Sequence, residues 1–363
     1  PPPHPPPTPA MPFSLPVALR ELHLRRGSDL HLKADAPATV RVLGDLVPID
    51  NVRVTETELT ATLESIANEK LVKVFREKGE VDFRYSIPNL CHYRVNFYKT
   101  FNGTAAAFRE IPASIPSLEE LGVNPDLKKL SMLDSGLVLV TGPTGSGKST
   151  VTAALIDYAN QRRKDHILTI EDPIEFIYQD KSCFVSQREV GTHSQSFADA
   201  LRVALREDPD IIVVGEMRDY ETVSLAIEAA ETGHLVFATL HTRSAAQTVD
   251  RIIDIFPSDD KAQIRASLAD SLQAVMSVAL MKAADGTHRV QAMEILMANP
   301  AIRNLIREGK THQIPNVLQT GKAQGMCTMD DALEDLLREG EITRETALKY
   351  ARNPDKFKSS PIY

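Results

Sequence analysis

The sequence predicts an α/β protein in which a small α+β domain precedes a parallel sheet that is covered by helices on both faces. Residues 15–112 mix short helical and strand-like patterns, which indicates the small domain. From residue 136 onward, continuous runs of Val, Ile and Leu alternate with helical patterns, as in parallel strands buried on both faces. Residues 113–135 contain several prolines, and we interpret them as a linker.

The composition is that of a globular protein and disfavours several other classes. The chain has 363 residues, enough for two or three domains at about 100–200 residues each. Its net charge of −8 disfavours a nucleic-acid coat protein. Three scattered cysteines exclude a four-cysteine zinc site and suit a reducing cytoplasm. No run reaches the roughly 18–20 apolar residues of a membrane span, and no signal peptide is visible, so we expect any membrane contact to be peripheral.

The first part of the chain is expected to contain a disordered tail and one small domain. Residues 1–14 are proline-rich, and we interpret them as a disordered tail, with a ligand for a proline-binding module as the alternative. Thr55 and Glu58 have the spacing of a helix capping box. The residue patterns predict helices over 15–26 and 55–78, and strands near 28–33, 39–43, 46–49, 81–86, 92–98 and 105–111.

The second domain is expected to span residues 136–363. Short apolar runs predict core strands at 136–141, 167–170, 211–215 and 235–239. After about Pro257 the pattern predicts helices to the end, including a buried helix within residues 268–284. The domain is therefore expected to have a helical C-terminal extension.

The strongest motif is a glycine-rich loop between a predicted strand and a predicted helix. Glycines allow the backbone amides of such a loop to close around phosphates, and the N-terminus of the following helix attracts anions. We predict that Lys148 reaches the terminal phosphates and that Ser149 binds Mg²⁺. The motif G-x-x-x-x-G-K-[ST] and the next residue comprise Gly142, Pro143, Thr144, Gly145, Ser146, Gly147, Lys148, Ser149 and Thr150.

Carboxylates follow two other predicted core strands. Glu216 follows the strand at 211–215, where it would belong to the Mg²⁺ shell or orient the attacking water. Glu171 and Glu175 follow the strand at 167–170. Clustered carboxylates favour a cation or a shared proton, so we favour Glu175 or Glu171 as a general base or metal-shell group.

Two histidines flank another core strand. His241 follows the strand at 235–239, at the edge where the phosphates are expected, and is suited to sensing a γ-phosphate. His234 precedes this strand, a position more typical of a structural hydrogen bond. Spacing alone ranks neither residue as catalytic.

Arginines are also candidates, because shared ATPase sites commonly receive an arginine from a neighbouring subunit. Arg94 and Arg109 lie in strand-like runs of the first domain, where an exposed charge is the simplest interpretation. Arg202, Arg206 and Arg218 flank the strand at 211–215, and the pattern does not distinguish among these three.

Taken together, these motifs resemble the ATPases of type II and type IV secretion and of type IV pili, most closely the pilus retraction ATPases. The resemblance covers roughly residues 15–340. Residues 301–308, with the sequence AIRNLIRE, resemble the signature of the retraction branch. Only Cys327 follows the His box, whereas extension ATPases usually carry four cysteines there. The family motifs are the Walker A loop at 142–149, the Asp box at 169–175, an atypical Walker B segment at 208–219 and the His box at 232–242.

The resemblance implies a PAS-like first domain and a RecA-like second domain that bind ATP and Mg²⁺ between them in a homohexamer. Three departures from the family pattern, at Asp35, Val151 and Cys327, leave open a paralogue with an altered partner. The implied roles are water activation by Glu175, Walker B function for Glu216, sensing or coupling by His234 and His241, and phosphate contacts from Arg94 and Arg109 across the subunit interface.

The function implied by the resemblance is a cytoplasmic motor that retracts type IV pili and thereby drives twitching motility. It would act at the cytoplasmic face of the inner membrane on a pilus platform protein, with a paralogous motor ATPase as a further partner and no nucleic acid. The alternatives are a low-turnover accessory or regulatory paralogue, a pilus or secretion assembly ATPase, and a nucleic-acid motor.

Overall fold

The computed structural model describes residues 13–87, 91–111 and 114–358. The chain divides into two compact units, Pro1–Ala113 and Ser114–Tyr363. The boundary lies next to residue 112, where we expected the first domain to end. Residues 1–12, which make up most of the predicted proline-rich tail, lie outside the described residues.

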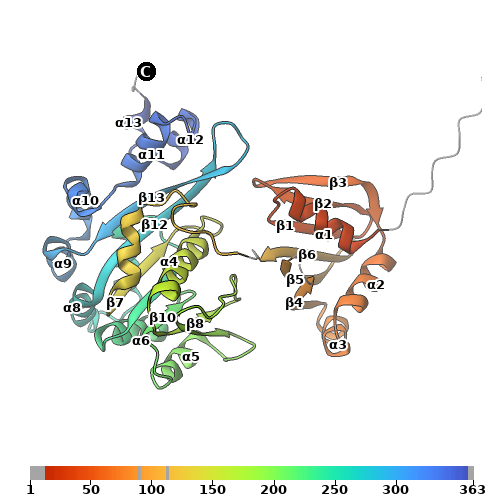
Figure 1. Cartoon of the computed structure of the whole chain (residues 1–363), viewed down its shortest axis with the longest axis horizontal. Helices are drawn as coiled ribbons and strands as arrows, with labels where there is room; N and C mark the ends of the chain where they lie inside the picture. Colours follow the sequence, from red (N-terminus) through yellow and green to blue (C-terminus); the bar gives the residue numbers. More distant parts are fainter. Residues whose placement is uncertain (1–12, 88–90, 112–113, 359–363) are drawn as a thin grey trace, which may run out of the picture. The chain divides into compact units, whose positions relative to one another are not determined.

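The first unit is an antiparallel sheet with helices packed on one face (Figure 1). Its strand order is β3-β2-β1-β6-β5-β4, and apolar side chains of the helices share one core with Tyr93, Val95 and Phe97 of β5. This arrangement agrees with the predicted α+β domain. The elements are α1 (Leu15–Leu24), β1 (Asp29–Lys33), β2 (Ala36–Val42), β3 (Asp45–Val54), α2 (Glu56–Ile66), α3 (Glu69–Lys78), β4 (Glu80–Ile87), β5 (Cys91–Thr100) and β6 (Gly103–Ile111).

The helix predicted over residues 55–78 begins as expected but is two helices. Thr55 accepts a hydrogen bond from the Glu58 amide, and the Glu58 side chain accepts one from the Thr55 amide, so the capping box is confirmed. The chain then leaves the helical conformation at Ala67. Asn68 restarts it by accepting a hydrogen bond from the Leu71 amide, because asparagine is a favourable N-cap residue.

The second unit is built on a mostly parallel sheet with the order β13-β12-β7-β11-β10-β8-β9. The four predicted core strands correspond to β7 (Gly136–Thr141), β8 (His166–Glu171), β10 (Ile211–Val214) and β11 (Leu235–Leu240), and their pairings with one another are parallel. Helices cover both faces of the sheet, which explains why these strands are continuous apolar runs. The helices of this part are α4 (Lys148–Arg162), α5 (Phe197–Ala204), α6 (Tyr220–Glu231), α7 (Ala245–Asp254) and α8 (Lys261–Ser271).

Two strands replace part of the helical region predicted after Pro257. The expected buried helix within residues 268–284 is wrong, because α8 ends at Ser271 and β12 (Leu272–Lys282) follows at once. β12 pairs with β7 and with β13 (Arg289–Met297). Its apolar run is buried on both faces, so it lacks the alternation that would have distinguished a strand from a buried helix.

The C-terminal part of the second unit is helical, as predicted for the extension. No helix of the described residues is long and apolar enough to cross a membrane. The helices are α9 (Pro300–Arg307), α10 (Ile314–Thr320), α11 (Met329–Arg338), α12 (Arg344–Tyr350) and α13 (Asp355–Lys358). Short 3₁₀ turns η2 (Thr311–Gln313) and η3 (Lys322–Gln324) join some of them, and β9 (Phe184–Glu189) completes the sheet at its other edge.

The predicted linker is also corrected. Residues 114–135 belong to the second unit, and η1 (Pro125–Met132) packs against α4. Leu118, Leu127 and Leu130 are buried in the same core cluster as β7 and α4. The prolines therefore interrupt helices and strands, but residues 114–135 still pack in the core of the second unit.

Candidate nucleotide-binding site

The glycine-rich loop joins the central strand β7 to α4. Gly142, Gly145 and Gly147 have φ values of 143°, 77° and 93°, which side-chain-bearing residues rarely adopt. A Cβ atom at Gly142 would lie 2.4 Å from the Val278 carbonyl oxygen, so any other residue would displace the loop. The loop can therefore approach phosphates with its backbone, as the motif predicts.

Lys148 begins α4 and folds back over the loop. Its Nζ donates hydrogen bonds to the carbonyl oxygens of Gly142 at 2.8 Å and Pro143 at 3.1 Å. Burial lowers the pKa of Lys148, and the negative charges of Glu216 and Glu175 oppose this shift. The ammonium group therefore lies where both carboxylates act on it.

The ends of three parallel strands bring the Walker A and Walker B residues together. β11 pairs with β7 so that Leu240 lies opposite Thr141, which places His241 beside the glycine-rich loop. His241 Nδ1 is 3.5 Å from Lys148 Nζ, and His241 Nε2 is 2.9 Å from Glu216 Oε1. His241 thus bridges the lysine of one motif and the carboxylate of the other.

The surroundings of Glu216 favour its ionised form. Burial alone would raise its pKa, but the hydrogen bond from Arg218 and the interactions with His241 lower the pKa of Glu216 below its usual value. The Arg218 Nε atom lies 2.6 Å from Glu216 Oε1. Only 17% of the Glu216 side chain is exposed, so the carboxylate is held in a defined position.

The two acids that follow β8 have different environments. Glu171 accepts hydrogen bonds from Thr169 Oγ1 at 2.6 Å and Gln187 Nε2 at 3.1 Å. Burial raises the pKa of Glu171, and these hydrogen bonds oppose the shift. Glu175 is exposed and acts electrostatically on Lys148. The geometry therefore favours Glu175 over Glu171 as a group that can contact water and phosphate.

His234 lies at the opposite end of β11 from His241. Its Nδ1 atom is 3.0 Å from the Ala229 carbonyl oxygen, and its own carbonyl oxygen accepts a hydrogen bond from the Gly136 amide. Gly136 begins β7, whereas the glycine-rich loop follows the end of this strand. Within one subunit, the placement of His234 opposes the sensing or coupling role that the resemblance implies and agrees with the structural hydrogen bond expected from its position.

Arg94 and Arg109 lie opposite each other on β5 and β6 of the first unit. Arg109 Nε is 2.8 Å from Asp29 Oδ1, and Arg94 Nε is 3.8 Å from Asp82 Oδ1. Both arginines are exposed. Arg84 on β4 lies opposite Arg94, so three arginines form a row across this sheet. Asp29 and Asp82 partly neutralise this row, and both Arg94 and Arg109 would have to exchange these contacts to bind a phosphate.

The sequence did not identify two supporting residues. It left Arg202, Arg206 and Arg218 unranked, and the structure selects Arg218, because this residue contacts Glu216. Gln187 was missed entirely, because it lies on β9, which was not predicted. Residues 184–189, with the sequence FVSQRE, do not alternate between apolar and polar side chains, so the sequence carried no clear strand signal here.

The oxygen atoms around the loop suit a hard cation and phosphate. Ser146 Oγ is buried and makes no hydrogen bond within the described part of the chain, so it can donate to a phosphate oxygen. Ser149 and Glu216 supply hydroxyl and carboxylate oxygens, the ligand type that Mg²⁺ prefers. The donor set therefore fits the predicted Mg²⁺–nucleotide pair.

A mostly parallel α/β sheet with a Walker A loop after β7, a carboxylate after β10 and a histidine after the intervening strand β11 that contacts both motifs defines a P-loop NTPase. Residues 77–324 match the family model described as "Type II/IV secretion system protein". The chain belongs to this family.

Relatives and solved structures extend this assignment. The chain is 52% identical over 318 residues to a twitching motility protein of Neisseria gonorrhoeae, covering 88% of this chain and 85% of that protein. It is 50% identical to PilT of Pseudomonas aeruginosa, a type IV pilus retraction ATPase, covering 91% and 96%. A crystal structure of the pilus retraction motor PilT with bound ADP has a TM-score of 0.85 and 43% identity, covering 95% and 98%.

Proposed function

We propose that this protein is an ATPase that powers the retraction of type IV pili. The observation that carries the proposal is the contact chain from Lys148 through His241 to Glu216, which joins the phosphate-binding loop to an ionised acid. Similarity to PilT over nearly the whole chain supports the type IV pilus as the structure on which the ATPase acts. Identity to the type IV pilus ATPase PilU of Pseudomonas aeruginosa is lower, at 39% over 333 residues, which favours a retraction ATPase of the PilT type.

In this proposal the glycine-rich loop and Lys148 bind the phosphates of ATP. Lys148 exchanges its hydrogen bonds to the Gly142 and Pro143 carbonyls for phosphate oxygens. Ser149 and Glu216 would hold Mg²⁺, and the ion would supply positive charge beside the phosphates. His241 reports on the γ-phosphate, because it contacts both Lys148 and Glu216.

Glu175 acts as the group that orients and deprotonates the attacking water. It is exposed and lies within electrostatic reach of Lys148. Glu171 is a positioning residue, because it accepts a hydrogen bond from the Glu175 amide at 3.4 Å and is itself held by Thr169 and Gln187. Arg218 keeps Glu216 ionised and in place.

The arginine row of the first unit completes the site from a neighbouring subunit. Arg94 and Arg109 are exposed on one sheet and supply positive charge that stabilises the transferring phosphoryl group. This role requires an assembly, and we propose a homohexamer in the cytoplasm. The ring would act on an inner-membrane platform protein and work beside a paralogous motor ATPase, without nucleic acid.

The direct test is ATP turnover by the purified full chain. Lys148→Ala is expected to abolish both nucleotide binding and hydrolysis. Glu216→Gln is expected to lower kcat by about 10²- to 10⁴-fold, with a smaller effect on ATP binding, because its main role is in hydrolysis. Normal ATP turnover by Lys148→Ala would refute the assignment of the site.

A further inference from the structure

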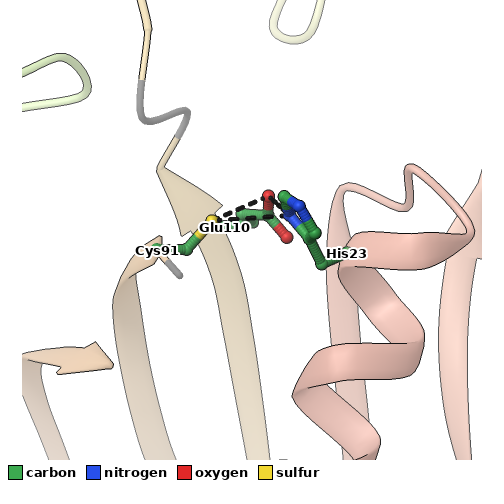
Figure 2. A group of neighbouring side chains, drawn as sticks. All are labelled: His23, Cys91 and Glu110. Atoms are coloured by element: carbon green, nitrogen blue, oxygen red, sulfur yellow. Dashed lines mark hydrogen bonds and ion pairs between the residues drawn. The ribbon is translucent and has the colours of Figure 1, made fainter. Parts of the chain in front are cut away.

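A group of three potential metal ligands lies in the first unit and includes no residue that we assign to the nucleotide site. Figure 2 shows His23 of α1, Cys91 at the start of β5 and Glu110 near the end of β6 with their side chains pointing toward one another. One ligand atom from each side chain lies within 4.8 Å of the others. Within the part of the chain that the structure describes, no other three His, Cys, Asp or Glu residues meet in this way.

The topology of the sheet explains why the three residues meet. Tyr93 lies opposite Glu110 in the β5–β6 pair, and Cys91 is two residues from Tyr93, so all three side chains share the face on which the helices pack. α1 packs on that face through its buried leucines, and His23 lies in its last turn. Arg94 and Arg109, the neighbours of Tyr93 and Glu110, are exposed on the other face.

We propose that His23, Cys91 and Glu110 form a binding site for a zinc ion. Thiolate, imidazole and carboxylate are the three side-chain types that bind Zn²⁺. Water would complete a tetrahedron, because 45% of the His23 side chain is exposed and opens the group to solvent.

The distances among the ligand atoms suit zinc. In a tetrahedral site with Zn–S of about 2.3 Å and Zn–N of about 2.0 Å, the sulfur and nitrogen atoms lie about 3.5 Å apart. The distance between Cys91 Sγ and His23 Nδ1 is 3.6 Å. Glu110 Oε1 lies 2.8 Å from His23 Nδ1 and 3.0 Å from Cys91 Sγ, so it would move outward by about 0.5 Å to reach tetrahedral spacing.

A buried oxygen atom without a hydrogen-bond partner supports the presence of a bound ion beside these three side chains. Glu110 Oε2 is buried and has no hydrogen-bond partner among the described residues. Tyr93 Oη is likewise buried without a partner among the described residues, and unpaired buried atoms of this kind are where a bound ion or water is expected. A hydrogen-bonded network without metal accounts only for Oε1, which both His23 and Cys91 contact. A zinc ion bound by both carboxylate oxygens would also account for Oε2.

Binding replaces a proton with the metal ion. Cys91 Sγ donates a hydrogen bond to Glu110 Oε1 at 3.0 Å, so the sulfur carries a proton when no metal is bound. Zn²⁺ forms a bond to the sulfur, and the thiol proton leaves to solvent. The ion would tie α1 to the two strands that carry Arg94 and Arg109.

The test begins with titration of the purified full chain with Zn²⁺ alone, in which competition with a chromophoric chelator measures the affinity. A second titration uses Co²⁺, because a bond between cobalt and a thiolate gives a charge-transfer absorption band. The proposal predicts this band for the unchanged chain and its loss in Cys91→Ser. Cys183→Ser and Cys327→Ser are matched controls, because their sulfur atoms contact backbone carbonyls elsewhere in the second unit. Both controls should keep the band.

A second variant protects the test against misfolding. His23→Ala alters a half-exposed side chain at the end of a helix, so the chain should remain folded. It should weaken Zn²⁺ binding at least about tenfold and reduce the rise in unfolding temperature that Zn²⁺ produces. No cobalt–thiolate band in the unchanged chain, or unchanged Zn²⁺ affinity in folded His23→Ala, would overturn the proposal.

Discussion

Replacing His241 with alanine tests whether the contact between the two nucleotide-site motifs matters for hydrolysis. The change removes the 2.9 Å contact between His241 Nε2 and Glu216 Oε1 and the 3.5 Å contact with Lys148 Nζ. A hydrogen bond to a charged group contributes about 1.5–3 kcal/mol. Because 42% of the His241 side chain is exposed, solvent screening reduces this to about 1–2 kcal/mol.

If this interaction holds Glu216 in its catalytic position, its loss lowers kcat by roughly 5- to 30-fold. Steady-state ATP turnover of the purified chain at pH 8 measures the effect. His312→Ala is the matched control, because His312 is an exposed histidine of the same unit and should leave kcat unchanged. A kcat for His241→Ala within twofold of the unchanged chain would refute the reasoning.

The same variant makes a prediction about pH. Arg218 and His241 lower the pKa of Glu216, so the stability that these contacts contribute is present above the pKa of the unfolded carboxyl. It is lost as pH falls through the lower pKa of the folded state. Removing His241 raises the Glu216 pKa toward its usual value, and the acid limb of the kcat profile should move to higher pH. Because Arg218 remains, the loss of rate at pH 8 reflects geometry and not protonation.

Three further changes test other parts of the account. Glu171→Gln should leave kcat within about threefold, whereas Glu175→Gln lowers it by about 10²- to 10⁴-fold. Because burial raises the pKa of Glu171, the chain loses stability as pH rises from the usual carboxyl range through that pKa. Thermal unfolding over a rising pH series should show a smaller loss of stability in Glu171→Gln. Arg94→Ala should lower kcat by about 10³-fold without changing the unfolding temperature, because the residue is exposed. A kcat equal to that of the unchanged chain would exclude Arg94 from the nucleotide site. Thr55→Ala removes the capping box and should cost about 1 kcal/mol in urea unfolding, and an unchanged midpoint would contradict this.

The sequence predicts a part of the fold correctly where one local residue pattern, such as a continuous apolar run or the glycine-rich motif, is enough to define the structure. The buried runs of β7, β8, β10 and β11 and the glycine-rich loop are local features, and their predicted positions are confirmed. The apolar run of β12 is buried on both faces, so periodicity could not separate a strand from a helix. The prolines of residues 114–135 suggested a linker, although the leucines between them enter the core.

The site was predictable as a set of motifs but not as a set of contacts. The spacing placed Glu216 and His241 at strand ends, yet their contact depends on the parallel register of β10 and β11. The selection of Arg218 depends on how the chain turns after β10. His23, Cys91 and Glu110 are far apart along the sequence and share no motif, so only the folded sheet brings them together.

Live imaging of labelled pili tests the proposed function most directly. A strain that lacks this protein is complemented either with the unchanged chain or with Glu216→Gln. The account predicts that the unchanged chain restores retraction, and that cells with Glu216→Gln extend pili, fail to retract them and become hyperpiliated. Bald cells in the deletion strain, or normal retraction with Glu216→Gln, would contradict the account.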